Sequence, residues 1–213
     1  MLSKGFLPTH LPDDPMPLFE QWFDGARKAK AQPNPDSMAL ATVGADGRPS
    51  VRIVLCKKLV ARPGYAVFFT NYQSRKGSEL AAFPRAAAVF HWDPHGRQVR
   101  IEGPVVRSPE DESDEYFASR ALDSRIGAWA SQQSQPLESR TTLLKRVAVE
   151  AARFGPQVPR PPHWGGYRLW PETVELWIEG PFRVHDRARW TRSLEPEGAG
   201  YSPGPWSATR LYP

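Results

Sequence analysis

The sequence predicts an α+β fold that is mainly antiparallel β and closes into a barrel, with peripheral helices packed around it. Three observations predict this class. Runs rich in β-branched and aromatic residues follow one another across short turns, whereas a parallel sheet would need a helix after each strand. Proline supplies 23 of the 213 residues, about twice the usual ~5%, which disfavours a helical bundle. The glycine motifs of dinucleotide-binding and P-loop folds do not occur in the sequence.

The first part of the chain is predicted to form one helix and three strands. Residues 15–31 carry apolar side chains at helical spacing, with Asp13 or Asp14 as a cap and Pro15 in the first turn. An Asp46-Gly47 turn between two β-rich runs predicts a hairpin. The elements after the helix are strands at 37–44, 51–57 and 65–70, a polar loop at 71–76, and a short helix that ends near Pro84.

The rest of the chain is predicted to alternate strands with one helical region. The expected elements are a hairpin of strands at 86–92 and 98–106, helices over 109–155 with breaks near 121–124 and 134–136, strands near 166–170, 173–179 and 182–190, a Gly/Pro-rich loop at 194–205, and a strand that ends at Pro213. We therefore expect six to eight strands in a single domain over 1–213, in which 1–14 is an N-terminal segment free to move and 15–213 form the barrel and its packed helices.

Cys56 is the only cysteine, so an intramolecular disulfide and a cysteine-based zinc site are both excluded. Its apolar neighbours favour a packing role over a nucleophilic one. No apolar run approaches the ~20 residues that cross a bilayer, and residues 1–8 lack the apolar core of a signal peptide. We expect a cytoplasmic protein with no membrane partner and no metal site.

The charge balance favours an anionic small molecule over nucleic acid as the ligand. The formal net charge is +5, and the chain contains 21 Arg against 7 Lys. Guanidinium groups bind phosphates and carboxylates through two parallel hydrogen bonds, which lysine cannot do. The cations are scattered among acids instead of forming one long stripe, so no nucleic-acid partner is predicted, although salt-sensitive DNA binding would revive that reading.

A first candidate site consists of four cations near strand ends, namely Arg52, Lys57, Arg75 and Lys76, which together could bind a phosphate. Residues five apart on a regular strand face opposite sides, so Arg52 and Lys57 can share a ligand only across a bend, a bulge or a large ligand. Cations that simply face solvent are the competing interpretation.

A second candidate site is the series Tyr116, Arg120 and Ser124. If the helix is continuous, spacings of four place all three donors on one face, where they could bind one phosphate. Ordinary helix-surface chemistry is the alternative.

A third candidate lies in the stretch 183–187. On a strand, Arg183, His185 and Arg187 would point the same way, close to Trp177. A histidine between two arginines on one strand face is a better site candidate than an isolated one.

In this order along the chain, several stretches resemble the pyridoxine (pyridoxamine) 5′-phosphate oxidase family, whose fold is the FMN-binding split β-barrel. Each stretch alone is weak evidence, whereas ten in register are specific. The matching stretches are 52–57 (Arg-Ile-Val-Leu-Cys-Lys), 68–76, 97–99, 116–120, 123–129, 133–134, 163–166, Trp177, 183–187 and 210–213.

The resemblance implies a homodimer with FMN in clefts at the subunit interface. It implies FMN contacts by Arg52, Ile53, Val54, Leu55, Lys57, Phe69, Thr70, Arg75, Lys76, Gln98, Gln133, Ser134, Trp177 and Arg187. It implies binding of the substrate phosphate by Lys57, Tyr116, Arg120 and Ser124, with Arg183 and His185 as catalytic residues over the substrate ring.

The activity that the resemblance implies is FMN-dependent oxidation of pyridoxine 5′-phosphate and pyridoxamine 5′-phosphate to pyridoxal 5′-phosphate, with O2 reduced to H2O2. Phe69 stands where many members of the family have Tyr, and Leu2 lies near the position of a Tyr in the N-terminal segment of some members. Two alternatives stay open: a split-barrel flavin oxidase or reductase for another substrate, such as a phenazine precursor, and a non-catalytic binder of flavin or pyridoxal phosphate.

Overall fold

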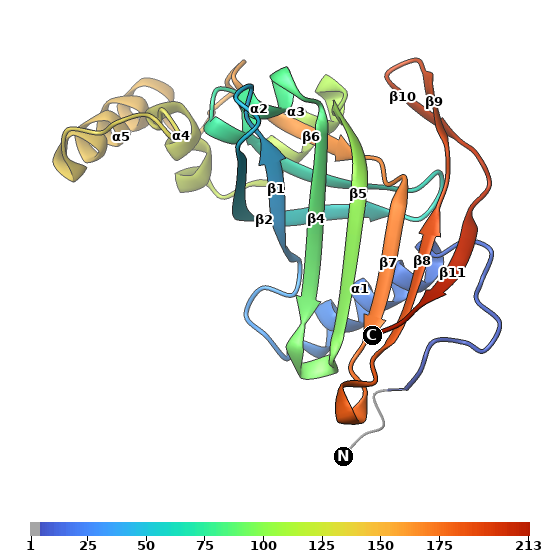
Figure 1. Cartoon of the computed structure of the whole chain (residues 1–213). Coiled ribbons are helices and arrows are strands. Elements are labelled where there is room, and N and C mark those ends of the chain that lie inside the picture. The colour runs from blue at the N-terminus through green and yellow to red at the C-terminus, as the bar shows by residue number, and fades with distance from the viewer. Residues whose placement is uncertain (1–4) are drawn as a thin grey trace.

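The computed structural model describes residues 5–213 and contains a closed antiparallel barrel of six strands (Figure 1). Around the barrel the strand order is β1-β2-β3-β6-β5-β4, and hydrogen bonds between β5 and β6 and between β4 and β1 complete the ring. The barrel strands are β1 (Ser37–Val43), β2 (Pro49–Val60), β3 (Tyr65–Asn71), β4 (Arg85–Trp92), β5 (Arg97–Arg107) and β6 (Trp164–Leu169). The predicted class, an α+β split barrel, is therefore confirmed.

Strand β5 belongs to two parts of the sheet, because its lower half pairs with β7 while its upper half pairs with β6. From β7 the sheet continues through β8 to β11, outside the barrel. These strands are β7 (Thr173–Ile178), β8 (Asp186–Thr191) and β11 (Ser207–Leu211), and a separate hairpin is formed by β9 (Leu194–Glu197) and β10 (Gly200–Pro203). Eleven strands are thus found within residues 5–213, more than the six to eight predicted.

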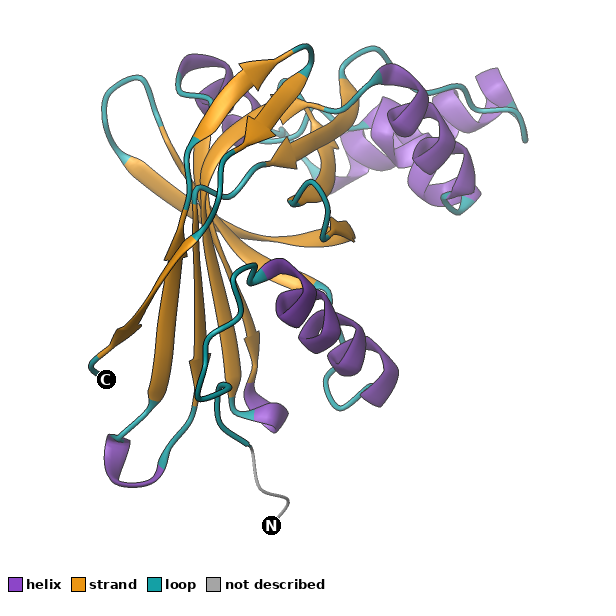
Figure 2. Ribbon diagram, turned by 90° about the vertical axis from the view of Figure 1, so that its right-hand side faces the viewer, coloured by secondary structure: helices purple, strands orange, loops and turns teal. Residues whose placement is uncertain are grey.

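The helices lie outside the sheet and cover different parts of it (Figure 2). They are α1 (Met16–Ala29), α2 (Arg75–Ala82), α3 (Glu110–Ser119), α4 (Leu122–Ala130) and α5 (Arg140–Phe154). On α1, Phe19 and Phe23 are buried and meet Phe90 of β4 edge to face, at centroid distances of 5.1 and 5.9 Å. Burial of such rings stabilises the fold, since Phe→Ala in a core costs about 3–5 kcal/mol. This contact fixes the helix against the lower half of the sheet.

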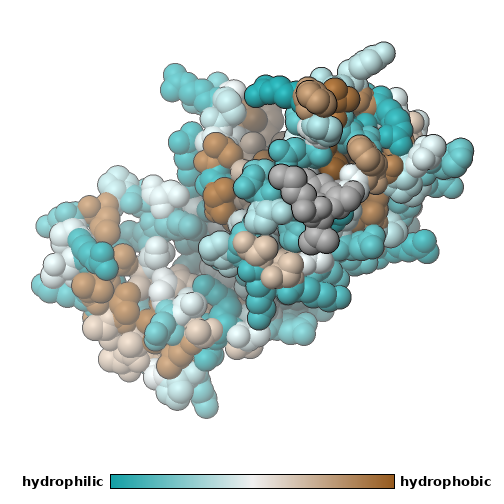
Figure 3. Space-filling view, turned by 90° about the horizontal axis from the view of Figure 1, so that it is seen from below, coloured by the Kyte–Doolittle hydropathy of each residue, from teal (hydrophilic) through white to brown (hydrophobic). Residues whose placement is uncertain are grey.

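Helices α4 and α5 form an arm that projects from the barrel at the left of Figure 1. Helix α5 packs mainly on α4, and the side chains of Leu144 and Val149 are more than half exposed. Apolar patches are accordingly visible on the arm in the view from below (Figure 3). A second small core of Phe117, Ile126, Val158 and Trp164 joins the arm to the barrel.

The hairpin predicted at the Asp46-Gly47 turn is present, with Gly47 at φ 76°. Farther along β2 the pairing with β3 shifts register between Cys56 and Lys58, which is the geometry of a β-bulge. Lys57 is the extra residue of this bulge, because Cys56 and Lys58 pair with two adjacent residues of β3. A bulge is one of the conditions given above under which Arg52 and Lys57 can share a ligand.

Two predicted elements are wrong in detail. The loop expected at 194–205 contains the β9–β10 hairpin, which turns at Gly198 with φ 55°. The strand expected over 182–190 begins only at Asp186, because Phe182 and Arg183 have left-handed φ values of 55° and 63° that no strand accommodates.

The first residues that the structure describes lie against β8, in the part of the sheet outside the barrel. Leu7 is buried and its N–H donates to the Asp186 carboxylate at 2.8 Å, while the Trp190 indole N–H donates to the Pro12 carbonyl at 2.7 Å. The expectation about Leu2 concerns a residue outside the described range. Within residues 5–213, none of the helices has the length and apolarity needed to span a bilayer.

Candidate functional site

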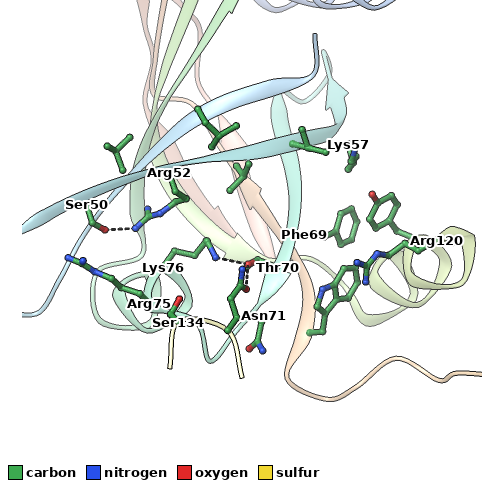
Figure 4. A pocket seen from close by; sticks show the side chains of 17 residues that line it. Ser50, Arg52, Lys57, Phe69, Thr70, Asn71, Arg75, Lys76, Arg120 and Ser134 are labelled. Carbon is green, nitrogen blue, oxygen red and sulfur yellow. Dashed lines mark hydrogen bonds between the residues drawn. The ribbon is translucent and has the colours of Figure 1, made fainter. Parts of the chain in front are cut away.

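A cavity of about 660 Å³ lies between β2, β3, the start of α2 and the end of α3 (Figure 4). Thirteen of the predicted site residues line it: Arg52, Ile53, Val54, Leu55, Lys57, Phe69, Thr70, Arg75, Lys76, Tyr116, Arg120, Gln133 and Ser134. Five of these are cations, and no Asp or Glu is found among the described residues that line the cavity. The charge of the lining suits an anionic ligand.

At one end of the cavity Arg52, Arg75 and Lys76 converge, and we call these three residues the cation cradle (Figure 4). Arg75 and Lys76 are the first two residues of α2 and not part of a loop as predicted. The helix can start here because Gly77 has no side chain: a Cβ atom at that position would lie 2.0 Å from the Tyr72 carbonyl oxygen. The partial positive charge of a helix N-terminus adds to that of the side chains.

Lys76 is almost fully buried at the bottom of the cradle. Its ammonium group donates to Thr70 Oγ1 at 3.0 Å and to Ser74 Oγ at 3.1 Å. An ammonium has three N–H donors. Two of them are used by acceptors within the described residues, so one is left for a ligand. Burial and the nearby charge of Arg52 lower the pKa of Lys76 to about 8, although Glu79 opposes the shift.

Arg52 and Lys57 both reach the cavity despite their odd spacing on β2, because the cavity is lined by both faces of this strand, with every residue from Ser50 to Leu55 contributing. Lys57 lies at the other end of the cavity from the cradle (Figure 4), and its Nζ atom is 2.8 Å from the Asp36 carboxylate. The four cations of the first candidate site therefore line one cavity but divide between its two ends.

At the end of the cavity where Lys57 and Arg120 lie, three aromatic rings are nearly parallel. Phe69 stacks on Tyr116 at 4.0 Å and on Trp164 at 5.6 Å, with interplanar angles of 20° and 10°. Phe69 on β3 pairs with Gly166 on β6, where a Cβ atom would lie 2.9 Å from the Phe69 ring. The glycine therefore leaves room for the stack, which provides a flat apolar wall to the cavity.

Arg120 lies beside this wall without an anionic partner. Its guanidinium carbon is 4.7 Å from the centre of the Trp164 ring, and its buried Nη1 atom has no hydrogen-bond acceptor among the described residues. Burial lowers the pKa of the Arg120 guanidinium. A half-buried cation with a buried N–H group that lacks an acceptor is costly, which points to an anionic ligand that completes it.

The helical spacing argument for Tyr116, Arg120 and Ser124 is wrong, although two of the three residues do line the cavity. Helix α3 ends at Ser119, and Arg120 is extended with ψ 150° before α4 begins at Leu122. Beyond the break, the Arg120 guanidinium lies over the Trp164 ring and lines the same cavity as Tyr116. Ser124 lies on α4 and does not line the cavity.

The remaining predicted residues form a second group, which we call the sheet group, away from the cavity. Gln98 on β5 pairs with Trp177 on β7, and Trp177 pairs with Arg187 on β8. The Trp177 ring lies 4.6 Å from the ring of His185, and Arg187 donates two hydrogen bonds to Glu175 Oε1 at 2.7 and 3.0 Å. The β7–β8 turn is at the lower end of the molecule in Figure 1, whereas α2 is at the upper end.

Arg183 and His185 do not lie on a strand, which corrects the argument that they share a strand face with Arg187. Arg183 is the last residue of a 3-10 turn, Pro181–Arg183, and His185 follows two residues later, where its Nδ1 accepts from the Gly180 N–H at 3.2 Å. In neutral His185 this hydrogen bond leaves the proton on Nε2. A single chain therefore does not bring Arg183 and His185 to the cavity.

Some cavity residues were not predicted as site residues. Ser50, Val51, Asn71 and Trp164 also line the cavity. Trp164 lies directly before Gly165 and Gly166, and this aromatic–glycine pattern could have indicated a flat wall. Within residues 5–213 no cluster of three or more His, Cys, Asp or Glu residues is placed to bind a metal.

The fold and the cavity define a class of protein: an antiparallel split barrel with a cation-lined, aromatic-walled cavity for an anionic ligand. Comparison with known families narrows this class. Residues 26–154 match the family model described as pyridoxamine 5′-phosphate oxidase, and residues 164–213 match the pyridoxine 5′-phosphate oxidase C-terminal dimerisation region. The chain belongs to the pyridoxamine 5′-phosphate oxidase family.

Relatives and solved structures agree with this assignment. The chain is 54% identical over 200 residues to the pyridoxine/pyridoxamine 5′-phosphate oxidase of Burkholderia orbicola, covering 94% of this chain and 89% of the relative. It is 52% identical to that of Rhodospirillum rubrum, covering 94% and 96%. The crystal structure of PhzG from Burkholderia lata 383 in complex with tetrahydrophenazine-1-carboxylic acid superposes with a TM-score of 0.82 at 32% identity, covering 98% of this chain and 100% of that one.

Proposed function

We propose that the protein oxidises pyridoxine 5′-phosphate and pyridoxamine 5′-phosphate to pyridoxal 5′-phosphate with FMN as cofactor. The observation that carries the proposal is the distribution of charge in the cavity. The cation cradle lies at one end, whereas Lys57, Arg120 and the aromatic wall lie at the other. Two anionic groups on two flat ring systems match this arrangement.

The donors of the cavity fit FMN. Arg52, Arg75 and Lys76 would bind its phosphate, which is a dianion near neutral pH. Hydrogen bonds from Thr70, Gln133 and Ser134 would hold the ribityl chain and add to the cradle. The side chains of β2, at Ile53, Val54 and Leu55, would lie along the ring system together with Phe69.

The other end would bind the phosphate of the substrate. Lys57, Tyr116 and Arg120 offer donors there, and the unpartnered Nη1 of Arg120 would gain an acceptor. Ser124 is placed in this group by family resemblance alone, because it does not line the cavity of the single chain.

The catalytic and ring-binding residues of the sheet group would come from a second copy of the chain. Trp177, Arg183, His185 and Arg187 all lie inside the matched dimerisation region at 164–213, and none of them lines the cavity of their own chain. In a homodimer, Gln98, Trp177 and Arg187 of one subunit would complete the flavin site of the other.

When bound, FMN would supply the acceptor for a hydride equivalent from the C4′ carbon of the substrate, and O2 would take up the electrons and two protons as H2O2. With the amine substrate, the resulting imine would add water and release ammonia to give the aldehyde. The task of the protein is to place the substrate ring against the cofactor. Arg183 would hold the substrate ring. His185 would take a proton from the 4′ hydroxyl or amine at Nε2 in its other tautomer, in which the ring proton lies on Nδ1 and the hydrogen bond from the Gly180 N–H is given up.

Oxidation of a phenazine precursor is the second candidate, and the similarity to PhzG favours it. Such a substrate carries a carboxylate instead of a phosphate. Three donors at Lys57, Tyr116 and Arg120 suit the greater charge of a phosphate, and the relatives above 50% identity are named for the phosphorylated vitamin. These observations support the vitamin as substrate.

The test combines a spectrum with a turnover assay. Purified protein loaded with FMN is expected to lose its visible flavin absorbance on anaerobic addition of pyridoxamine 5′-phosphate and to regain it with O2. Oxygen consumption and peroxide formation are then measured with the two vitamin phosphates and with tetrahydrophenazine-1-carboxylic acid. Turnover of the phenazine compound alone would contradict the vitamin assignment. Flavin binding without turnover of either compound would indicate a non-catalytic carrier.

A further inference from the structure

Glu79 is a buried carboxylate directly behind the cation cradle, and it does not line the cavity. Its side chain is 6% exposed, and it lies on α2, one turn after Arg75. The Arg75 Nε atom donates to Glu79 Oε1 at 2.8 Å, and the Arg52 Nη2 atom donates to Oε2 at 3.0 Å. One carboxylate therefore holds both guanidinium groups, each by a different oxygen.

The same carboxylate is fixed from the barrel side. Thr42 Oγ1 on β1 donates to Glu79 Oε2 at 2.5 Å, and Ser50 Oγ on β2 lies 2.7 and 2.9 Å from its two oxygens. Thr42 and Ser50 also accept hydrogen bonds from Arg52. Burial alone would raise the pKa of Glu79, but these hydrogen bonds outweigh it and lower the pKa to about 2. Glu79 is thus an anion at every physiological pH.

Two opposite effects on a bound phosphate are possible. By charge alone, an anion behind the cradle repels a phosphate, and its removal would strengthen phosphate binding. By geometry, the carboxylate keeps two arginines side by side and offsets the mutual repulsion of the three cations in the cradle. The donor pattern decides between them: each oxygen accepts from a different guanidinium, so an amide in place of the carboxylate must present its NH2 group to one of them.

We infer that Glu79 is the positioning residue of the cation cradle, and that it sets phosphate affinity by holding Arg52 and Arg75 in a fixed pair. The inference rests on the proposed function, because it takes the ligand in the cradle to be the phosphate of FMN. It also predicts an effect on the third cation, since Glu79 supports the protonated form of Lys76.

The test compares the affinities of FMN and riboflavin for the apoprotein, because the two ligands differ only in the phosphate. In Glu79→Gln, the ratio of FMN to riboflavin affinity is expected to fall by at least about tenfold, the effect of losing one charged hydrogen bond. Riboflavin affinity should stay unchanged. The midpoint of the pH dependence of FMN binding, expected near 8 from Lys76 in the original protein, should move to lower pH. If Glu79 served only the stability of the fold, Glu79→Gln would change neither the ratio of FMN to riboflavin affinity nor the midpoint pH of FMN binding.

Two further variants complete the design. Glu112→Gln is the matched control, because Glu112 is also a well-buried carboxylate paired with an arginine, Arg168 at 2.9 Å, and it does not contact the cradle. It should leave the ratio unchanged. If Glu79→Gln fails to fold, Thr42→Val removes one support of Glu79 and Arg52 while keeping the carboxylate, and a fall of about threefold is expected from a weak hydrogen bond.

The outcomes are separable. An unchanged or increased ratio in Glu79→Gln, or an unchanged ratio in Thr42→Val when that variant is needed, overturns the inference. If the unaltered protein itself binds FMN no more tightly than riboflavin, the phosphate does not occupy the cradle and the proposed function is what fails.

Discussion

Phosphate binding at the cation cradle is expected to weaken sharply above pH 8, because Lys76 must be protonated to contribute its charge. The pKa of Lys76 is lowered to about 8 in the protein without ligand. A bound phosphate dianion raises that pKa again, so binding takes up a proton when the pH exceeds 8. The second pKa of a phosphate monoester is about 6, so the ligand stays dianionic over the range concerned.

The magnitude follows from this linkage. When the pKa in the complex lies well above 9, the dissociation constant is inversely proportional to the protonated fraction of Lys76 in the free protein, and it rises about tenfold between pH 7 and pH 9. This factor corresponds to about 1.4 kcal/mol. The assay is the quenching of flavin fluorescence on titration of the apoprotein with FMN at half-unit pH intervals. Riboflavin, titrated in parallel, reports any titration of the ring system.

Lys76→Met provides the matched variant, since it keeps the length of the side chain and removes the titrating group. Its FMN affinity should be lower at pH 7 and nearly flat up to pH 9. The reasoning is refuted if the unaltered protein shows no loss of FMN affinity over this range, or if Lys76→Met shows the same tenfold loss.

Five other perturbations have defined outcomes. Arg183→Ala should lower turnover by about a hundredfold or more and leave flavin binding intact, whereas Arg75→Ala should release flavin first; equal losses of both in either variant would contradict the assigned contacts. The pKa of Glu79 falls from 4.5 to about 2 on folding, so Glu79 contributes about 3 kcal/mol to the free energy of unfolding above pH 4.5, and this contribution is lost toward pH 2. Glu79→Gln should therefore lose less stability than the unaltered protein between pH 4.5 and pH 2, and an unchanged acid transition would contradict this. Lys30→Gly should raise stability in urea by about 0.5–1 kcal/mol, because Lys30 ends α1 with φ 50°, and a loss of stability would contradict this. Burial raises the pKa of Cys56 to about 12, so alkylating reagents should modify this thiol only after unfolding, and rapid labelling of the native protein would refute its burial.

Much of the fold follows from local sequence patterns. The Asp46-Gly47 turn between two β-rich runs predicts the first hairpin, and the apolar spacing over 15–31 predicts α1, because turn chemistry and helical periodicity act within a few residues. The failures are also local. Phe182 and Arg183 have left-handed backbones that bulky residues seldom adopt, so a pattern of alternating side chains wrongly predicts a strand there.

The site is less accessible to sequence reasoning, because long-range pairing decides it. The cavity runs along both faces of β2, so Arg52 and Lys57 line it together although the alternation of a strand predicts opposite sides. Arg120 reaches the cavity through the helix break after Ser119 and not by helical spacing. Glu79 escapes notice for the same reason: four residues after Arg75, it looks like half of an ordinary surface ion pair, and only β1 and β2 bury it.

The division of the candidate residues between the cavity and the sheet group links occupancy to the amount of protein. In the proposed dimer, a ligand that touches both groups binds two associated chains more tightly than one alone, so by mass action it must also strengthen their association. Dilution of the protein separates the subunits and thereby lowers the affinity of each site for the ligand. At a limiting concentration of coenzyme, the occupied fraction of the sites therefore rises with the concentration of the protein.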